Sequence, residues 1–284
     1  MKKKSFIETY GPWALITGGA SGIGAEFGRQ LAGRGINLAL VDVQAGMLRD
    51  HAAAMEASYG IEARTAVVDL SGPDFMDGIR PVIDGLDIGL LVNNAGYGSV
   101  GEFMKTDIRE MLLTVAVNCR ASMVLAREIG PSMMERGRGG IIFVSSSSAS
   151  CGSPIIANYA ATKAYNLILA EALWEELRRY GVDVLALCPG ATETPAISKS
   201  GACLANVPGM PFTGPGPVVS EALEALGRSP GVIPGRMNRI AAFMMTRILP
   251  RRSAVAYTGK NLRKLYPQES KVESQKSKTV KISK

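Results

Sequence analysis

The chain has 284 residues, of which 46% are hydrophobic and 20% charged, and this composition excludes a disordered or fibrous protein. The formal net charge of +7 is concentrated at the ends, because residues 2–4 and the lysine-rich residues 267–284 each contribute +3. The near-neutral remainder does not favour nucleic-acid binding. No stretch approaches the roughly 20 apolar residues that span a bilayer, and no apolar segment completes a signal peptide after residues 2–4. We therefore expect a cytoplasmic protein.

Short aliphatic runs alternate with longer helical patterns through the first two thirds of the chain. Strands are predicted at 13–17, 37–43, 64–69, 88–92, 141–145 and 182–188, and helices at 23–32, 45–58, 107–134 and 157–180. Strands that are apolar on both faces and alternate with helices predict a parallel sheet covered on both sides. We predict a single α/β domain over residues 1–266 with a doubly wound, Rossmann-type sheet, whose ligand lies at the carboxyl ends of the strands.

Proline and glycine become frequent after residue 188. Their density predicts that residues 191–216 form a long loop without regular elements, of the kind that often binds substrate. A helix over 218–226, a strand-like segment at 232–234 and an apolar-basic helix over 236–252 are predicted to follow. Residues 267–284 lack the apolar residues that would offset their ordering entropy, so we expect them to be disordered.

A glycine-rich turn connects the first predicted strand to the first predicted helix. Gly18 permits a tight turn, Gly22 lets the backbone approach a pyrophosphate, and Gly24 allows the helix to lie close to the sheet. The start of this helix, with Ser21 and Ile23, presents unpaired N–H groups and a positive dipole end to phosphates. The strand before and the helix after the turn predict a dinucleotide site.

Two carboxylates bear on which dinucleotide is bound. Asp42 ends the second strand 18 residues after Gly24, where an acid can accept hydrogen bonds from ribose hydroxyls and repel a 2′-phosphate. Since no Lys or Arg is present at Val43, the sequence predicts NAD rather than NADP, unless Asp42 is only a solvated strand end or cap. Asp69, at the end of the third strand, could contact the adenine. The small residues that end the fourth strand and permit close contact with the sugar are Asn94, Ala95 and Gly96.

Candidate catalytic residues follow further along the chain. Tyr159 and Lys163 lie four residues apart in a predicted helix and share one face, so the ammonium should lower the pKa of the phenol. Ser146 ends the fifth strand, where its hydroxyl could polarise a carbonyl oxygen. Asn118 is a poor helix former inside a long predicted helix, and we interpret it as an irregularity that holds water near Lys163.

Together these motifs resemble the classical short-chain dehydrogenase/reductase family in order and spacing, over about residues 10–226. The resemblance implies that Tyr159 exchanges a proton with the substrate while Ser146 orients the substrate oxygen. It implies that Lys163 binds the nicotinamide ribose and acidifies Tyr159, and that Asn118 anchors a proton-relay water. Residues that the resemblance places in the cofactor site, beside Tyr159 and Lys163, are Pro189, Gly190, Thr192 and Thr194.

The sequence thus predicts an NAD-dependent oxidoreductase that interconverts a secondary alcohol and a ketone. Few charges occur in 191–216, so we expect a hydrophobic small-molecule substrate. Alternatives are an NADP-dependent ketoreductase of the same fold, a cofactor-binding protein whose chemistry has lapsed, and a nucleic-acid-binding role that rests only on the charged ends. We expect no metal site, because the four Cys lack ligand spacing and His51 is the only His.

The C-terminal part departs from the usual family pattern because it is longer. An apolar stripe that includes Ile240, Phe243 and Ile248 lies near several Arg residues within 236–252. We expect this helix to pack or to form a dimer contact, with peripheral membrane contact as the alternative. A homo-oligomer, a dimer or a tetramer, is the expected assembly.

Overall fold

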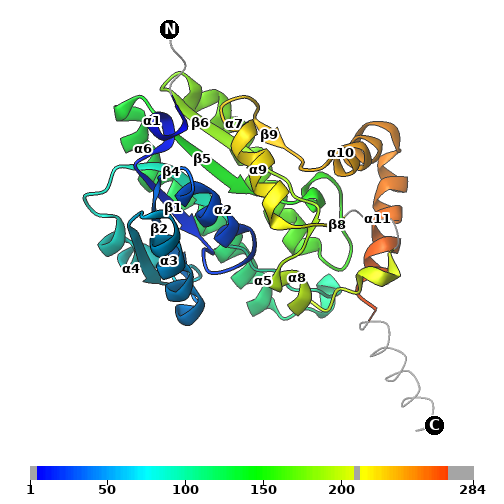
Figure 1. Ribbon diagram of the computed structural model, residues 1–284. Coiled ribbons are helices and arrows are strands. Elements are labelled where there is room, and N and C mark those ends of the chain that lie inside the picture. Colours follow the sequence, from blue (N-terminus) through cyan, green and yellow to red (C-terminus); the bar gives the residue numbers. More distant parts are fainter. Residues whose placement is uncertain (1–4, 208–211, 268–284) are drawn as a thin grey trace, which may run out of the picture.

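Seven parallel strands form the central sheet of the computed structural model, which describes residues 5–207 and 212–267 (Figure 1). The strands are β1 (Trp13–Thr17), β2 (Asn37–Asp42), β3 (Ala63–Val67), β4 (Ile88–Asn93), β5 (Gly139–Val144), β6 (Val182–Leu187) and β9 (Gly231–Val232). Their order is β3-β2-β1-β4-β5-β6-β9, and each neighbouring pair is parallel. The predicted doubly wound α/β fold is confirmed. The order reverses between β1 and β4, which is where such sheets bind ligands.

Helices cover both faces of the sheet, as the two-sided apolar strands predict. The helices around the sheet are α1 (Phe6–Tyr10), α2 (Gly22–Ala32), α3 (Ala45–Tyr59), α4 (Phe75–Ile83), α5 (Ile108–Val115), α6 (Ala121–Arg136), α7 (Ala157–Arg178) and α9 (Pro215–Ala225). Alternate side chains of β1 enter two separate cores: Ile16 packs with α2, α3 and α9, while Leu15 packs with α4, α6 and α7. Buried side chains fill both faces of the sheet, so a ligand can bind only at the strand ends.

Two predicted elements differ from the structure. The helix expected over 107–134 is α5 and α6 joined by a π-helix at Ala116–Arg120. Residues 191–216 are not wholly irregular, since β7 (Ala191–Thr192) pairs with β8 (Phe212–Thr213) and α8 spans Pro195–Lys199. Prolines there did not prevent helix formation, because they occupy the first turns of α8 and α9, where proline is tolerated. Residues 208–211 of the expected loop lie outside the described residues.

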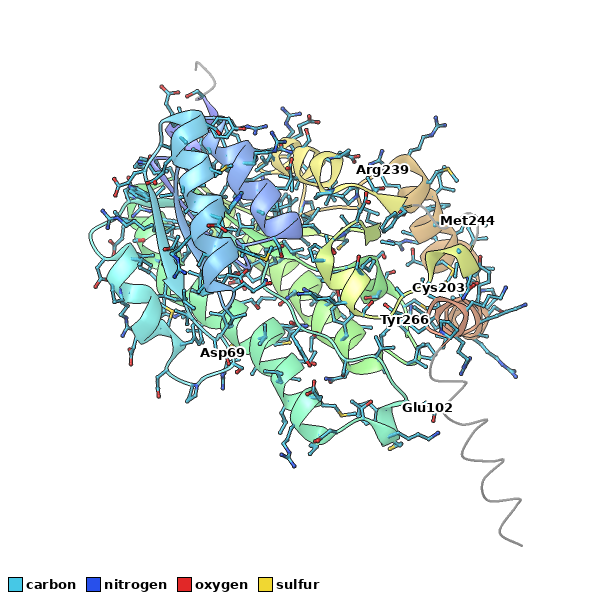
Figure 2. The ribbon with its side chains drawn as sticks, turned by 60° about the horizontal axis from the view of Figure 1, so that its bottom comes forward. Asp69, Glu102, Cys203, Arg239, Met244 and Tyr266 are labelled. Carbon is cyan, nitrogen blue, oxygen red and sulfur yellow. The ribbon has the colours of Figure 1, made fainter. Side chains whose placement is uncertain are left out.

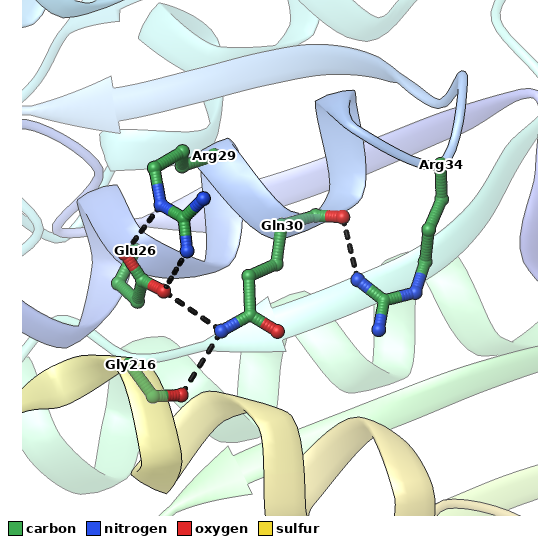
Figure 3. Close-up of polar contacts among 5 residues, drawn as sticks. All are labelled: Glu26, Arg29, Gln30, Arg34 and Gly216. Atoms are coloured by element: carbon green, nitrogen blue, oxygen red, sulfur yellow. Dashed lines mark hydrogen bonds and ion pairs between the residues drawn. The ribbon is translucent and has the colours of Figure 1, made fainter.

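The end of the loop predicted over 191–216 is fixed to the rest of the fold through α9 (Figure 3). The side chain of Gln30 on α2 donates to the Gly216 carbonyl oxygen of α9 at 3.0 Å and to Glu26 at 2.7 Å. Glu26 also forms an ion pair with Arg29 at 2.6 Å. The contact from Gln30 to Gly216 joins the end of the loop to the C-terminal half of α2.

The C-terminal extension forms two helices rather than one. The segment predicted as a helix over 236–252 comprises α10 (Arg236–Phe243) and a π-helix at Met244–Ile248, and it ends at Leu249, whose backbone is extended before Pro250. A further helix, α11 (Arg251–Leu265), follows. Figure 1 shows α10 and α11 together at the side of the molecule away from α3 and α4. The tail predicted to be disordered lies outside the described residues from 268 onward.

None of the helices within 5–207 and 212–267 has the length and apolar character needed to cross a membrane.

Candidate active site

The turn after β1 is held against the end of β4 by hydrogen bonds. The Thr17 hydroxyl accepts from the backbone N–H groups of Asn94 at 3.1 Å and Ala95 at 3.0 Å. The Asn94 side-chain amide donates back to the carbonyl oxygens of Thr17 at 2.8 Å and Gly18 at 3.1 Å. Asn94 and Ala95 thus position the glycine turn, and Thr17 is a functional position that the sequence analysis missed.

The geometry of the glycine turn fits a dinucleotide. Gly18 and Gly22 have φ of 65° and 58°, in the left-handed region that favours glycine. A Cβ atom at Gly24 would overlap the Gly18 carbonyl oxygen, so the start of α2 can lie this close only with glycine there. Ser21 precedes α2 and makes no side-chain cap, which leaves the N–H groups of the first turn, where Ile23 lies, for an anion.

The two predicted adenosine contacts have different surroundings. Asp42 is buried, and its carboxylate accepts from the backbone N–H groups of Ala20 and Gln44, both at 3.0 Å. Its charge is therefore fixed beside the glycine turn. Asp69 lies two residues beyond the end of β3 rather than in it, and it is exposed. The Ser71 backbone N–H donates to its carboxylate at 2.8 Å and lowers its pKa, so the structure does not tie Asp69 to the turn.

Helix α7 presents Tyr159 and Lys163 at the end of β5. Lys163 is only 3% exposed, and its ammonium donates to the Val144 carbonyl oxygen at 2.8 Å. The same nitrogen lies 5.7 Å from the centre of the Tyr159 ring. Ser146 forms a hydrogen bond with the Tyr159 hydroxyl, whereas Ser145 donates to the Lys163 backbone oxygen at 2.6 Å. The structure therefore brings Ser146, Tyr159 and Lys163 together and gives Ser145 a supporting role.

The direction of the pKa shift at Tyr159 differs from the sequence prediction. Burial raises the pKa of Tyr159, the hydrogen bond from Ser146 opposes this rise, and the nearby Tyr266 phenol adds to it. Burial also lowers the pKa of Lys163 to about 8, so its own charge is disfavoured. The net shift is therefore opposite to the predicted acidification, because burial of the phenol has the largest effect. Tyr159 is consequently a protonated phenol at neutral pH.

Asn118 lies in the π-helix between α5 and α6, so the irregularity predicted from its poor helix propensity is present. Its side chain accepts from the Tyr97 N–H, and donates to the Tyr97 carbonyl oxygen and the Thr162 hydroxyl, each at 2.8 Å. A Cβ atom at Gly96 would lie 3.2 Å from the Lys163 ammonium. Gly96 therefore lies next to both the Lys163 ammonium and the Asn118 side chain, while the proposed water relay stays a prediction.

The segment after β6 completes the edge of the site. The Ser147 N–H donates to the Pro189 carbonyl oxygen at 2.8 Å, which places this segment next to Ser146. Thr192 is buried and donates to the Gly190 carbonyl oxygen at 3.1 Å. A Cβ atom at Gly22 would lie 3.1 Å from the Thr194 side chain, so the glycine turn meets this segment.

The C-terminal extension also reaches the site, which the sequence analysis did not foresee. A Cβ atom at Gly190 would lie 2.7 Å from the Asn238 side chain of α10. Tyr266, after α11, interacts with Tyr159. Asn238 lies 48 residues after Gly190, and Tyr266 lies 107 residues after Tyr159. Neither residue therefore belongs to a local motif. Only the folded chain shows these contacts.

Residues 12–203 match the family described as short chain dehydrogenase. The very-long-chain 3-oxoacyl-CoA reductase of Aspergillus clavatus is 32% identical over 232 residues, which cover 79% of this chain and 66% of that protein. The protein of the same name from Mycosarcoma maydis is 30% identical over 264 residues, covering 88% and 73%. The chain thus spans about two thirds of the length of these curated relatives.

Solved structures share the fold. A structure from work on 7beta-hydroxysteroid dehydrogenase stereoselectivity superposes with a TM-score of 0.82 and 28% identity, over 90% of this chain and 99% of that one. A short-chain dehydrogenase from Sphingobium yanoikuyae in complex with NADPH gives 0.73 and 27%, over 82% and 92%. A 3-ketoacyl-(acyl-carrier-protein) reductase from Brucella melitensis complexed with NADH gives 0.69 and 26%, over 80% and 98%.

Burial of Lys163 predicts a pH-dependent stability. In the unfolded chain the Lys163 ammonium has a pKa of about 10.4, whereas in the folded chain its pKa is about 8. Between these pH values the unfolded chain binds more protons, so the free energy of unfolding rises with pH. From pH 7.5 to 9.5 the wild type should gain about 2 kcal/mol relative to Lys163→Met in urea unfolding. Lys199→Met, at an exposed position, should parallel the wild type. Identical pH profiles for wild type and Lys163→Met would contradict the assigned burial.

Proposed function

Since this chain belongs to the short-chain dehydrogenase family, we propose that it is an NAD-dependent oxidoreductase that interconverts a ketone and a secondary alcohol on a hydrophobic substrate. The observation that carries the proposal is the convergence of Ser146, Tyr159 and Lys163 at the end of β5, within one edge of the sheet that also holds the glycine turn. The glycine turn and Asp42 would hold the dinucleotide, and Lys163 its nicotinamide ribose.

The catalytic residues have distinct roles in reduction of a ketone. The nicotinamide supplies the hydride when it is bound. Tyr159, whose raised pKa keeps the phenol protonated, donates its proton to the carbonyl oxygen. The Ser146 hydroxyl donates a hydrogen bond to the same oxygen and orients it. Lys163 supports the phenolate that remains, because a phenolate beside it would favour the charged form of the ammonium. Oxidation of the alcohol is the reverse sequence.

Two observations support a hydrophobic ketone. The described part of 191–216 has only Glu193 and Lys199 as charged side chains. The curated relatives are named as reductases of very-long-chain 3-oxoacyl-CoA, and a structural relative comes from work on a hydroxysteroid dehydrogenase. We therefore propose a ketone carried on a long or bulky apolar body, reduced to the alcohol.

The preference for NAD rests on Asp42. Two backbone N–H groups fix its carboxylate beside the glycine turn, and the next residue is Val43, which is exposed and carries no charge. A 2′-phosphate placed there would meet a negative charge without a cation to balance it. Because structural relatives bind NADPH as well as NADH, cofactor preference needs its own measurement.

Replacing the phenol of Tyr159 should remove catalysis without removing the cofactor. In a reduction screen over ketones of graded size, Tyr159→Phe should lower kcat by about 10²- to 10⁴-fold, the usual contribution of a positioned acid. The affinity for NADH, measured by fluorescence, should stay close to that of the wild type. Tyr165→Phe, at a 39% exposed position on the same helix, should retain activity. Unchanged turnover in Tyr159→Phe would instead favour a cofactor-binding protein without this chemistry.

Replacing the carboxylate of Asp42 should weaken discrimination between cofactors. The wild type should show a kcat/KM with NADH at least about tenfold above that with NADPH, and Asp42→Asn should reduce this ratio about tenfold, because about 1.4 kcal/mol of repulsion is lost. Asp69→Asn, at the exposed position, should leave the ratio unchanged. Comparable wild-type turnover with both cofactors would show that the NAD assignment is wrong.

A further inference from the structure

The C-terminal hairpin, defined as residues 236–266, exposes large apolar side chains. Neither α10 nor the following π-helix contains a buried residue. Phe243 is 58% exposed and Ile248 56% exposed. The other exposed apolar residues of the hairpin are Met237, Ile240, Met244, Leu249 and Tyr257. An apolar helix face normally packs against a core, so a face left in solvent indicates a binding surface. Within one chain, α10 thus leaves this apolar face unpacked.

The same hairpin carries a net charge of +8. Between Arg236 and Tyr266 there are eight Lys and Arg residues and no Asp or Glu. Residues 5–266 have a net charge of only +1, so the eight positive charges of the hairpin leave −7 on residues 5–235. The near-neutral body thus consists of a negative sheet domain and a strongly positive hairpin.

The hairpin is anchored to the fold while its apolar residues stay outside. Arg239 on α10 forms an ion pair with Glu221 on α9 at 2.7 Å. Arg251 on α11 donates to the Ser150 carbonyl oxygen at 2.8 Å, next to the catalytic segment. Figure 2 shows Arg239 and Met244 at the side of the molecule away from Asp69. The exposed face is consequently held in a fixed orientation beside the active site.

Charge distinguishes between the possible occupants of this face. In a symmetric dimer through this face, each copy would place its cationic residues opposite the same residues of the other copy, which is unfavourable. An anionic membrane offers negative headgroups for the Lys and Arg residues and an apolar interior for Phe243 and Ile248. We propose that the C-terminal hairpin binds the surface of an anionic membrane through this face, which places the catalytic segment that Arg251 contacts next to the bilayer.

Vesicle co-sedimentation of the full chain tests this proposal. The protein should pellet with vesicles of phosphatidylcholine and phosphatidylserine in equal amounts, less so at high salt, and not with phosphatidylcholine alone. Phe243→Glu/Ile248→Glu should weaken binding about tenfold or more, because two inserted side chains become charged. Met47→Glu/Met104→Glu changes the charge equally at exposed apolar positions outside the hairpin and should bind like the wild type.

Two results would overturn the membrane proposal. Equal pelleting of Phe243→Glu/Ile248→Glu and the wild type, with binding lost only when residues 1–4 and 268–284 are removed, would assign binding to the lysine-rich ends. A change in oligomeric state of that variant in light scattering, without wild-type pelleting, would make the face an interface between copies. Circular dichroism of both variants establishes that each is folded.

A separate set of contacts concerns the inner side of the hairpin. The Cys203 N–H donates to the Leu265 carbonyl oxygen at 2.6 Å, and the Asn206 side chain donates to the Lys264 carbonyl oxygen at 3.0 Å. The end of α11 is thereby fixed to the substrate loop. A Cβ atom at Gly259 would lie 3.1 Å from Pro154, so α11 also packs on the segment between Ser146 and Tyr159.

These contacts bring the end of the hairpin, where Tyr266 lies, close to the catalytic segment. Tyr266 directly follows Leu265 and is only partly exposed, and Figure 2 shows it close to Cys203. Its phenol interacts electrostatically with Tyr159. Building on the proposed function, we infer that Tyr266 lies beside the substrate at Tyr159 and limits the size of ketone that is accepted.

Substitution of Tyr266 has a matched control in Tyr257, which is 57% exposed on α11. Tyr266→Ala should raise kcat/KM for bulky ketones relative to small ones by about tenfold, with unchanged affinity for NADH, whereas Tyr257→Ala should leave the ratio unchanged. An unchanged ratio in Tyr266→Ala would overturn the inference. If the wild type reduces no ketone, the proposed function fails instead. In that case the pKa of Tyr159, measured by phenolate absorbance, still tests the position of Tyr266. Tyr266→Phe should lower this pKa, because Tyr266 raises it in the wild type.

Discussion

The site is organised around a buried cation. Lys163 is 3% exposed, and its ammonium has the Val144 carbonyl oxygen as a hydrogen-bond partner at the end of β5. A buried ammonium is costly unless surrounding groups satisfy it, so its neighbours are constrained. A Cβ atom at Gly96 would crowd the ammonium at 3.2 Å, and Asn118 links the loop after β4 to α7. The π-helix allows Asn118 to do this, because it shifts the helical register where the side chain is needed.

The parallel sheet explains why residues distant in sequence meet at this cation. The glycine turn follows β1, Asn94 follows β4, Ser146 follows β5 and Pro189 follows β6. All these strands point in one direction, so their carboxyl ends share one edge of the sheet. Hydrogen bonds between successive strand ends, from Asn94 to the glycine turn and from Ser147 to Pro189, then fix the spacing along that edge.

Local patterns predicted the parts of the site that depend on local geometry. Glycine spacing predicted the turn, and the four-residue spacing of Tyr159 and Lys163 placed both on one face of α7. The direction of the Tyr159 pKa shift was not predictable, because spacing does not reveal burial or the partner at Val144. Prolines were misread as excluding helices, although those in the first turns of α8 and α9 are compatible with helix.

The sequence analysis predicted an apolar-basic segment over 236–252 but not its charge contrast with the rest of the fold, because averaging hid that contrast. A body charge of +1 concealed two segments of opposite sign, and only the fold shows that the positive one forms a separate layer beside the substrate loop. Its two sides then have different requirements. The inner side needs small or buried residues, such as Ala254 and Gly259, to approach the catalytic segment, whereas the outer side carries exposed apolar and cationic residues. An extension that only covered the catalytic segment would need the small and buried residues but not the exposed apolar and cationic ones.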